Sequence, residues 1–148
     1  MKKYLDYIVL GCCILFPVLV LLLMLAPGTS VTLLGTTSTA SVYDCMSNGD
    51  STCVGLVFAL IFTIITLVEA VGLCAIKCLK INFKFGWIIA FAAALFAFVA
   101  GILFFCIKGL LDVADSELIK IGAGAIMSGI FSLFGAGAFA FYGVISKK

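Results

Sequence analysis

Residues 54–77, near the middle of the chain, read VGLVFALIFTIITLVEAVGLCAIK. Before Lys77, the only charged side chain in this stretch is that of Glu69. The hydrocarbon core of a bilayer is about 30 Å thick, and about 20 helical residues are needed to cross it. A continuous apolar run of this length therefore predicts a transmembrane helix.

Three further apolar runs of similar length flank this one. They cover approximately residues 6–26, 85–107 and 121–145. Three segments connect the four runs: an outer loop over 27–53, an inner loop over 78–84 and a second outer loop over 108–120. A membrane barrel would need alternating strands of about 10 residues, whereas these runs are continuous. The expected fold class is an all-α membrane protein, with residues 1–148 forming one four-transmembrane-helix bundle.

The composition agrees with a location in lipid and argues against several classes of function. Hydrophobic residues make up 65% of the 148 residues and charged residues 11%, whereas soluble domains have about 45–50% apolar and about 25% charged residues. The chain contains no His and no Arg. It therefore lacks the commonest metal ligand and general base, and it lacks the side chain that binds phosphate through two parallel hydrogen bonds. We expect no enzymatic activity, no metal or other cofactor, and no nucleic-acid partner.

The lysines predict how the chain is oriented, because short cytoplasmic loops retain positive charge during insertion. Only Lys108 and Lys120 fall in the predicted outer loops. The other side holds Lys2, Lys3, Lys77, Lys80, Lys84, Lys147 and Lys148. We therefore expect a multi-pass protein of the cell membrane, with both termini in the cytoplasm and the loops 27–53 and 108–120 outside.

The first outer loop, 27–53, carries β-prone patches at 31–34 and 41–43 around a turn-prone segment at 35–37. These patches are consistent with a short β-hairpin standing on the membrane. Cys45 and Cys53 enclose the turn signal Asn-Gly-Asp and would both face the oxidising side. We expect a disulfide that closes this part of the loop, and the alternative is a pair of free thiols.

Glu69 is the one carboxylate well inside a predicted span. A charge near the middle of a membrane costs about 2.5–3.5 kcal/mol on insertion scales, so this side chain should face the bundle and either have a partner or be protonated. The hydroxyls of Thr66 and Tyr142 are the candidate partners at similar depth. One interpretation is a cation or proton site. The other, which we favour, is a neutral carboxylic acid that donates a hydrogen bond between helices.

Small residues recur every four positions in the fourth span and form a column that predicts a helix-packing seam. This column consists of Gly124, Ser128, Ser132, Ala136 and Ala140. A matching row in the third span consists of Ala93, Ala97 and Gly101. We expect the two rows to pack against each other within one chain, and self-association through one of them is the alternative.

The order of the segments resembles that of the claudin-type tetraspan proteins. That family has four spans, a long first outer loop with a cysteine pair, a short inner loop and a short second outer loop. The resemblance is one of topology, since residues 39–44 before Cys45 read TASVYD in place of the family's Trp and Gly-Leu-Trp signature. It implies a role in sealing or patterning cell contacts or in assisting channels, and it implies that Cys45 pairs with Cys53.

Two classes of function remain open after these observations. The first is an interaction or structural protein in the lipid bilayer, which binds itself as a homo-oligomer or binds a larger membrane protein. Its contacts would be the small-residue seams and the first outer loop. The alternative is a small oligomeric channel or transporter in which Glu69 provides an ion or proton site.

Overall fold

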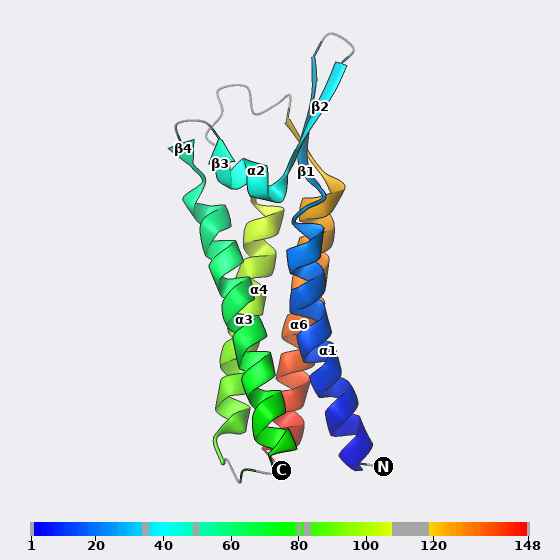
Figure 1. Ribbon diagram of the computed structural model, residues 1–148, viewed down its shortest axis with the longest axis vertical. Helices are drawn as coiled ribbons and strands as arrows, with labels where there is room; N and C mark the ends of the chain where they lie inside the picture. Colours follow the sequence, from blue (N-terminus) through cyan, green and yellow to red (C-terminus); the bar gives the residue numbers. More distant parts are fainter. Residues whose placement is uncertain are drawn as a thin grey trace.

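The computed structural model of the protein describes residues 2–33, 36–48, 51–79, 81, 84–107 and 119–147. Within these residues, four long helices form the body of the molecule: α1 (Lys2–Leu23), α3 (Val54–Cys78), α4 (Gly86–Phe105) and α6 (Ala123–Ser146). Each helix is long and apolar enough to cross a membrane. The prediction of four apolar helices in a multi-pass membrane protein is confirmed. Figure 1 shows the helices side by side in an elongated bundle, with both ends of the chain at the same end.

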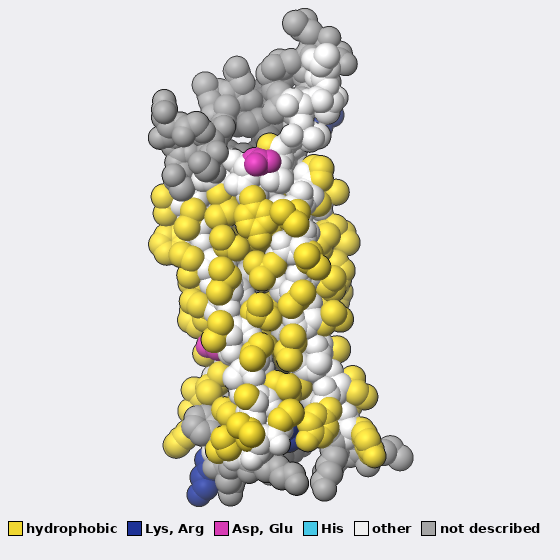
Figure 2. Space-filling model, in the orientation of Figure 1, with side chains coloured by type: hydrophobic (Ala, Val, Ile, Leu, Met, Phe, Trp, Pro, Cys, Tyr) yellow, Lys and Arg dark blue, Asp and Glu magenta, His cyan; other side chains and the backbone are white. Residues whose placement is uncertain are grey.

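Large apolar side chains cover the outside of the helices, as a lipid solvent requires. Leu22, Ile64, Leu95 and Phe134, one from each long helix, are all exposed on the bundle surface. Figure 2 shows hydrophobic side chains along the whole visible flank of the bundle. The helices satisfy their own backbone hydrogen bonds, which is necessary where no water is available.

We name the end of the bundle that holds the two termini the inner end and the opposite end the outer end (Figure 1). The outer end carries a small antiparallel sheet rather than an irregular loop. Strand β1 (Pro27–Leu33) pairs with β2 (Thr36–Ser41), from Thr29 opposite Ala40 to Leu33 opposite Thr36. The predicted hairpin is thereby confirmed. Its turn differs from the prediction, because Thr36 and Thr37 already belong to β2, and residues 34–35 lie outside the described part of the chain.

A third strand, β5 (Ile119–Ile121), pairs with the other edge of β1, so that the order is β2-β1-β5. Thr29 lies opposite Ile121, and Gly122 N–H donates to Gly28 O at 2.7 Å just beyond the strand. Most of the second outer loop, 108–118, lies outside the described residues. The sheet joins the chain that leaves α1 to the chain that enters α6.

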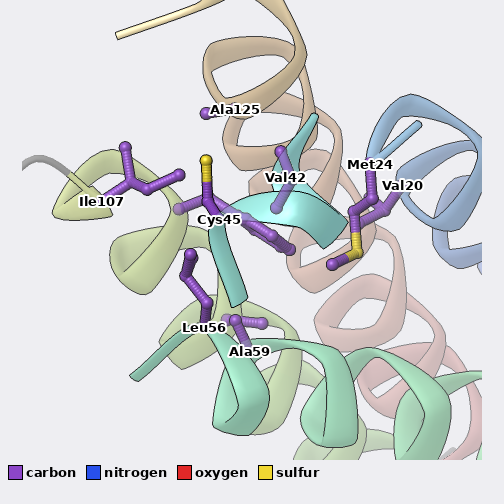
Figure 3. Close-up of a cluster of buried hydrophobic side chains, with 10 residues drawn as sticks. Val20, Met24, Val42, Cys45, Leu56, Ala59, Ile107 and Ala125 are labelled. Atoms are coloured by element: carbon purple, nitrogen blue, oxygen red, sulfur yellow. The ribbon is translucent and has the colours of Figure 1, made fainter. Parts of the chain in front are cut away.

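A short helix, α2 (Val42–Met46), lies across the outer end of the bundle (Figure 1). The sequence prediction for 41–43 was wrong, because only Ser41 lies in a strand and Val42 begins this helix. Val42 and Cys45 are buried, and they pack over residues of all four long helices or their ends (Figure 3). The same cluster contains Val20 of α1, Met24 just after α1, Leu56 and Ala59 of α3, Ile107 just after α4, and Ala125 of α6. Helix α2 therefore covers the outer end of the bundle.

Two further paired segments, β3 (Ser47–Asn48) and β4 (Ser51–Thr52), connect α2 to α3. Of the predicted Asn-Gly-Asp turn, Asn48 belongs to β3, and residues 49–50 lie outside the described part of the chain. Cys53 N–H donates to Met46 O at 2.9 Å, which brings the end of α2 directly onto the start of α3. The first outer segment is thus folded over its whole described length.

Candidate functional site

Glu69 lies on α3 close to the middle of the membrane-spanning stretch. It is three residues beyond the centre of Val54–Cys78, a displacement of about 4.5 Å at 1.5 Å per residue. The side chain is partly buried, and its Oε2 atom is buried without a hydrogen-bond partner. Phe62, one heptad earlier, stacks on Phe96 of α4 with ring centroids 5.5 Å apart. Glu69 therefore lies on the flank of α3 beside α4, at the edge of the buried face.

Neither of the two predicted partners of Glu69 bonds to its buried oxygen. Thr66 is buried, and its hydroxyl donates to Thr63 O within α3 at 2.7 Å. Tyr142 is buried in the inner half of the bundle, in a cluster that includes Leu10 and Leu73. Neither hydroxyl reaches Glu69 Oε2.

A small cavity lies inside the bundle between α1, α3, α4 and α6. Pro17, Thr63, Thr66, Ala97 and Ser132 are among its lining residues, and its volume is about 10 Å³. This is the volume that one water molecule needs. The hydroxyls around it are already bonded to backbone carbonyls, Thr63 to Ala59 O at 2.8 Å and Ser132 to Ala97 O at 2.7 Å. The cavity is a water-sized gap in a packed interior.

The small-residue rows predicted for the third and fourth spans are almost entirely buried. Gly124, Ser128, Ser132, Ala136, Ala93, Ala97 and Gly101 are buried, and Ala140 is half-buried. At Gly101, an added Cβ would lie 3.3 Å from Gly129 O and 3.0 Å from a methyl carbon of Leu133. The close approach of α4 and α6 explains why residues without bulk occupy these positions.

One buried hydroxyl in this seam has no partner. Ser128 is fully buried, and its Oγ makes no hydrogen bond. Ser132, one turn further along α6, instead donates to α4 across the seam. The seam is therefore an intramolecular contact that combines close packing with one interhelical hydrogen bond.

An ion pair that the sequence interpretation missed joins α1 to α3 at the inner end. Lys77 Nζ lies 2.8 Å from Asp6 Oδ2, and both side chains are partly buried. Nearby, Lys147 Nζ lies 5.2 Å from the centroid of the Trp87 ring, in a cation–π contact between α6 and α4. A signal for the ion pair existed, because Asp6 is the sole acidic residue near the lysine-rich end of the spans.

At the outer end, Ser41 and Asp44 form a reciprocal cap at the start of α2. Asp44 N–H donates to Ser41 Oγ at 3.1 Å, while Ser41 N–H and hydroxyl donate to Asp44 Oδ2 at 3.0 and 2.8 Å. This is the arrangement of a capping box. The hydrogen bonds from the Ser41 hydroxyl and N–H hold the pKa of the Asp44 carboxyl below its usual value.

The structure does not form the predicted disulfide between Cys45 and Cys53, whose sulfur atoms are not at bonding distance. Cys45 lies within α2, so its thiol is directed into the buried cluster and lies 3.3 Å from Thr29 Oγ1. Cys53 immediately precedes α3. Burial raises the pKa of the Cys45 thiol, which further lowers its reactivity. The structure therefore agrees with the alternative prediction, in which Cys45 and Cys53 both remain thiols.

Comparisons of the chain with known protein families, with curated proteins and with solved structures found no match. Among the described residues, no group of three or more Cys, Asp or Glu side chains gathers where a metal ion could be held. Two features are therefore candidates for function. One is the outer sheet together with helix α2, and the other is the carboxyl of Glu69 near the middle of α3.

Proposed function

We propose that this protein is a multi-pass interaction protein of the cell membrane, with the outer sheet as its recognition surface. One observation carries the proposal: the outer segments form a sheet fixed to the bundle, where a simple connection between helices would need only a short loop. Residues 36–39 of β2 are exposed, and Lys120 of β5 is exposed at the opposite edge of the sheet, across β1. Such short polar side chains on a fixed strand suit the binding of another protein.

The attachment of α2, which directly follows β2, to the end of α1 supports this role because it fixes the chain at the base of the sheet. Val42 N–H donates to Met24 O at 3.1 Å, and the Tyr43 hydroxyl donates to Leu21 O at 3.3 Å. A surface fixed before binding loses less conformational entropy when a partner binds. The lysine distribution supports placing this surface outside the cell and both termini in the cytoplasm, and the claudin-like order of segments supports the same role.

Photo-crosslinking from β2 tests the recognition surface. Ser38 and Thr39 point to opposite faces of the sheet, because side chains alternate along a strand. A photoreactive residue at each position, in native membranes, should give one discrete protein adduct from one of the two positions. A matched probe at Leu95, exposed on the flank of α4, should give lipid adducts. Adducts from neither strand position, or equal adducts from both, would contradict recognition through a face of this sheet.

A second candidate, an oligomeric channel or transporter, is favoured by the unpartnered Oε2 of Glu69. The interior of a single bundle argues against a pore through it, because Phe104 and Phe139 fill the two buried clusters. A permeation path would have to lie between subunits. Liposome flux with the wild type and Glu69→Gln, together with the mass of the protein in nanodiscs, separates the candidates. A monomer without flux removes the channel, whereas flux that depends on Glu69 establishes it.

A further inference from the structure

The outward side of α3 and its border with α4 carry two features that contact with lipid does not explain. One is the carboxyl of Glu69 and the other is Gly72, three residues later. Residues three apart are neighbours on a helix surface. Gly72 is exposed, and an added Cβ there would meet no atom within 4 Å. Val68 and Val71 beside it are also exposed. A second helix can therefore approach the backbone of α3 closely, next to the carboxyl.

The part of the chain that the structure describes does not provide a partner for the buried oxygen of this carboxyl. Glu69 Oε2 is buried without a hydrogen bond, and the Thr66 hydroxyl one turn away donates to its own helix. The nearest lysine along α3 is Lys77, eight residues or about 12 Å further along the axis, and it is paired with Asp6. A carboxyl in hydrocarbon with no partner is an incomplete interaction.

A cationic partner has to come from a different protein, because a second copy of this chain cannot supply a cation at the required depth. The sequence has no Arg or His, and its lysines lie at the ends of the helices or in the loops. Of the lysines whose side chains the structure describes, Lys77, Lys84 and Lys147 lie toward the inner end and Lys120 lies at the outer end. Charge complementarity therefore favours a foreign helix with a basic residue.

We propose that the face of α3 formed by Val68, Glu69, Val71 and Gly72 binds a transmembrane helix of another protein that carries a lysine or arginine at the depth of Glu69. The exposed Gly72 sets the crossing point, and the carboxylate receives the ammonium or guanidinium group. The inference deepens the interaction role proposed above, since it names the chemistry of a partner within the membrane. Its test does not involve the outer sheet, so the two proposals can fail separately.

A synthetic helix of about 20 leucine and alanine residues, long enough to cross the bilayer, is a suitable probe. One version has a single lysine at its centre, a second has leucine there, and a third has the lysine moved two turns toward one end. Resonance energy transfer to a fluorophore at the C-terminus of the full-length protein, in phosphatidylcholine bilayers, reports binding. We expect the central-lysine helix to bind about tenfold tighter than the leucine helix, the factor that corresponds to about 1.4 kcal/mol.

Substitutions in the protein assign this preference to the proposed face. Glu69→Gln should reduce binding of the central-lysine helix to that of the leucine helix, and Gly72→Leu should weaken binding of both. Gly11→Leu is the matched control, because Gly11 of α1 is also exposed with open space around it, and it should leave binding unchanged. Circular dichroism checks that each variant is folded.

Three results would overturn the proposal. The first is equal affinity for the central-lysine and leucine helices, which would leave lipid as the only occupant of this face. The second is a preference for lysine that Glu69→Gln does not remove. The third is self-association of the protein in the absence of any peptide, if Glu69→Gln abolishes that self-association. This result would make a second copy of the chain the occupant of the face.

Discussion

Replacing Gly124 with alanine tests the junction at which the outer sheet joins the bundle. An added Cβ at Gly124 would lie 2.6 Å from Ala26 O and 2.8 Å from Pro27 O. Both are backbone atoms, so the contact is relieved only by moving the start of α6 away from the end of α1. Overpacking of this kind costs about 1–3 kcal/mol. Alanine recovers at most about 1 kcal/mol through its better helix propensity, and less at a first turn.

Gly137→Ala on the same helix is the matched control, since an added Cβ at Gly137 would meet no atom within 4 Å. We therefore expect Gly124→Ala to be about 1–3 kcal/mol less stable than Gly137→Ala. Equilibrium unfolding in mixed detergent and dodecyl sulfate micelles, followed by circular dichroism, measures both free energies of unfolding. Hydrogen exchange at β1 should also become faster in Gly124→Ala alone. Equal stability of the two variants would refute the close contact between α6 and the α1–β1 junction.

Three further predictions concern single side chains. Cys45 should resist maleimide in the folded protein, because it is buried, and should react after denaturation without reductant; a need for reductant would show that a disulfide forms. Cys106, which is exposed, is the control that reacts first. Asp44 has a lowered pKa in the folded state. Its ionised carboxyl therefore stabilises the capping box at the start of α2 at pH values above its usual pKa of about 3.9. This stabilisation is lost as the pH falls through the lower pKa of the folded state. Hydrogen exchange of α2 against pH should show this loss, and Asp44→Asn should remove the dependence. Ser132→Ala should lower the free energy of unfolding by about 0.6–1.7 kcal/mol, since it removes the hydrogen bond to Ala97 O; no change in unfolding in micelles would mean that this bond contributes nothing.

The helices could be predicted closely because lipid imposes one requirement on every spanning segment. Their observed bounds, such as Val54–Cys78 and Ala123–Ser146, lie within a few residues of the predicted runs. The largest differences occur at the first span, which begins at Lys2 and ends at Leu23. Composition identifies residues that can lie in hydrocarbon, whereas the helix continues through the interface wherever its backbone hydrogen bonds can still form.

The outer end was predicted only in part, because its structure depends on contacts between segments far apart in the chain. The hairpin has a local signal, and it was found. Strand β5 (Ile119–Ile121) exists through its pairing with β1, about 90 residues earlier, and a three-residue strand carries no usable pattern of its own. Helix α2 did have a signal, the Ser41 to Asp44 spacing of a capping box, which the β-propensity of Val42 and Tyr43 outweighed.

The candidate site shows the same division between local and long-range information. The sequence alone identified Glu69 as unusual, since no other carboxyl lies well inside a predicted span. The rotation of α3 that leaves Glu69 at the edge of the buried face, away from Tyr142, depends on how four helices pack together. Similarly, the spacing of Cys45 and Cys53 permitted a disulfide, but the burial of Cys45 beneath the outer sheet directed its thiol toward Thr29.

The pairing of β1 with β5 also links the outer sheet to the order in which the chain is made. Strand β5 lies between α4 and α6 in the chain, so the sheet lacks one of its strands until residues 119–121 have been made and have reached the end of the bundle where β1 lies. A chain that stalls after three helices has β1 and β2 but not the completed surface. A partner that recognises all three strands would consequently bind only molecules made at least as far as β5, and recognition at the surface would distinguish them from shorter, stalled chains.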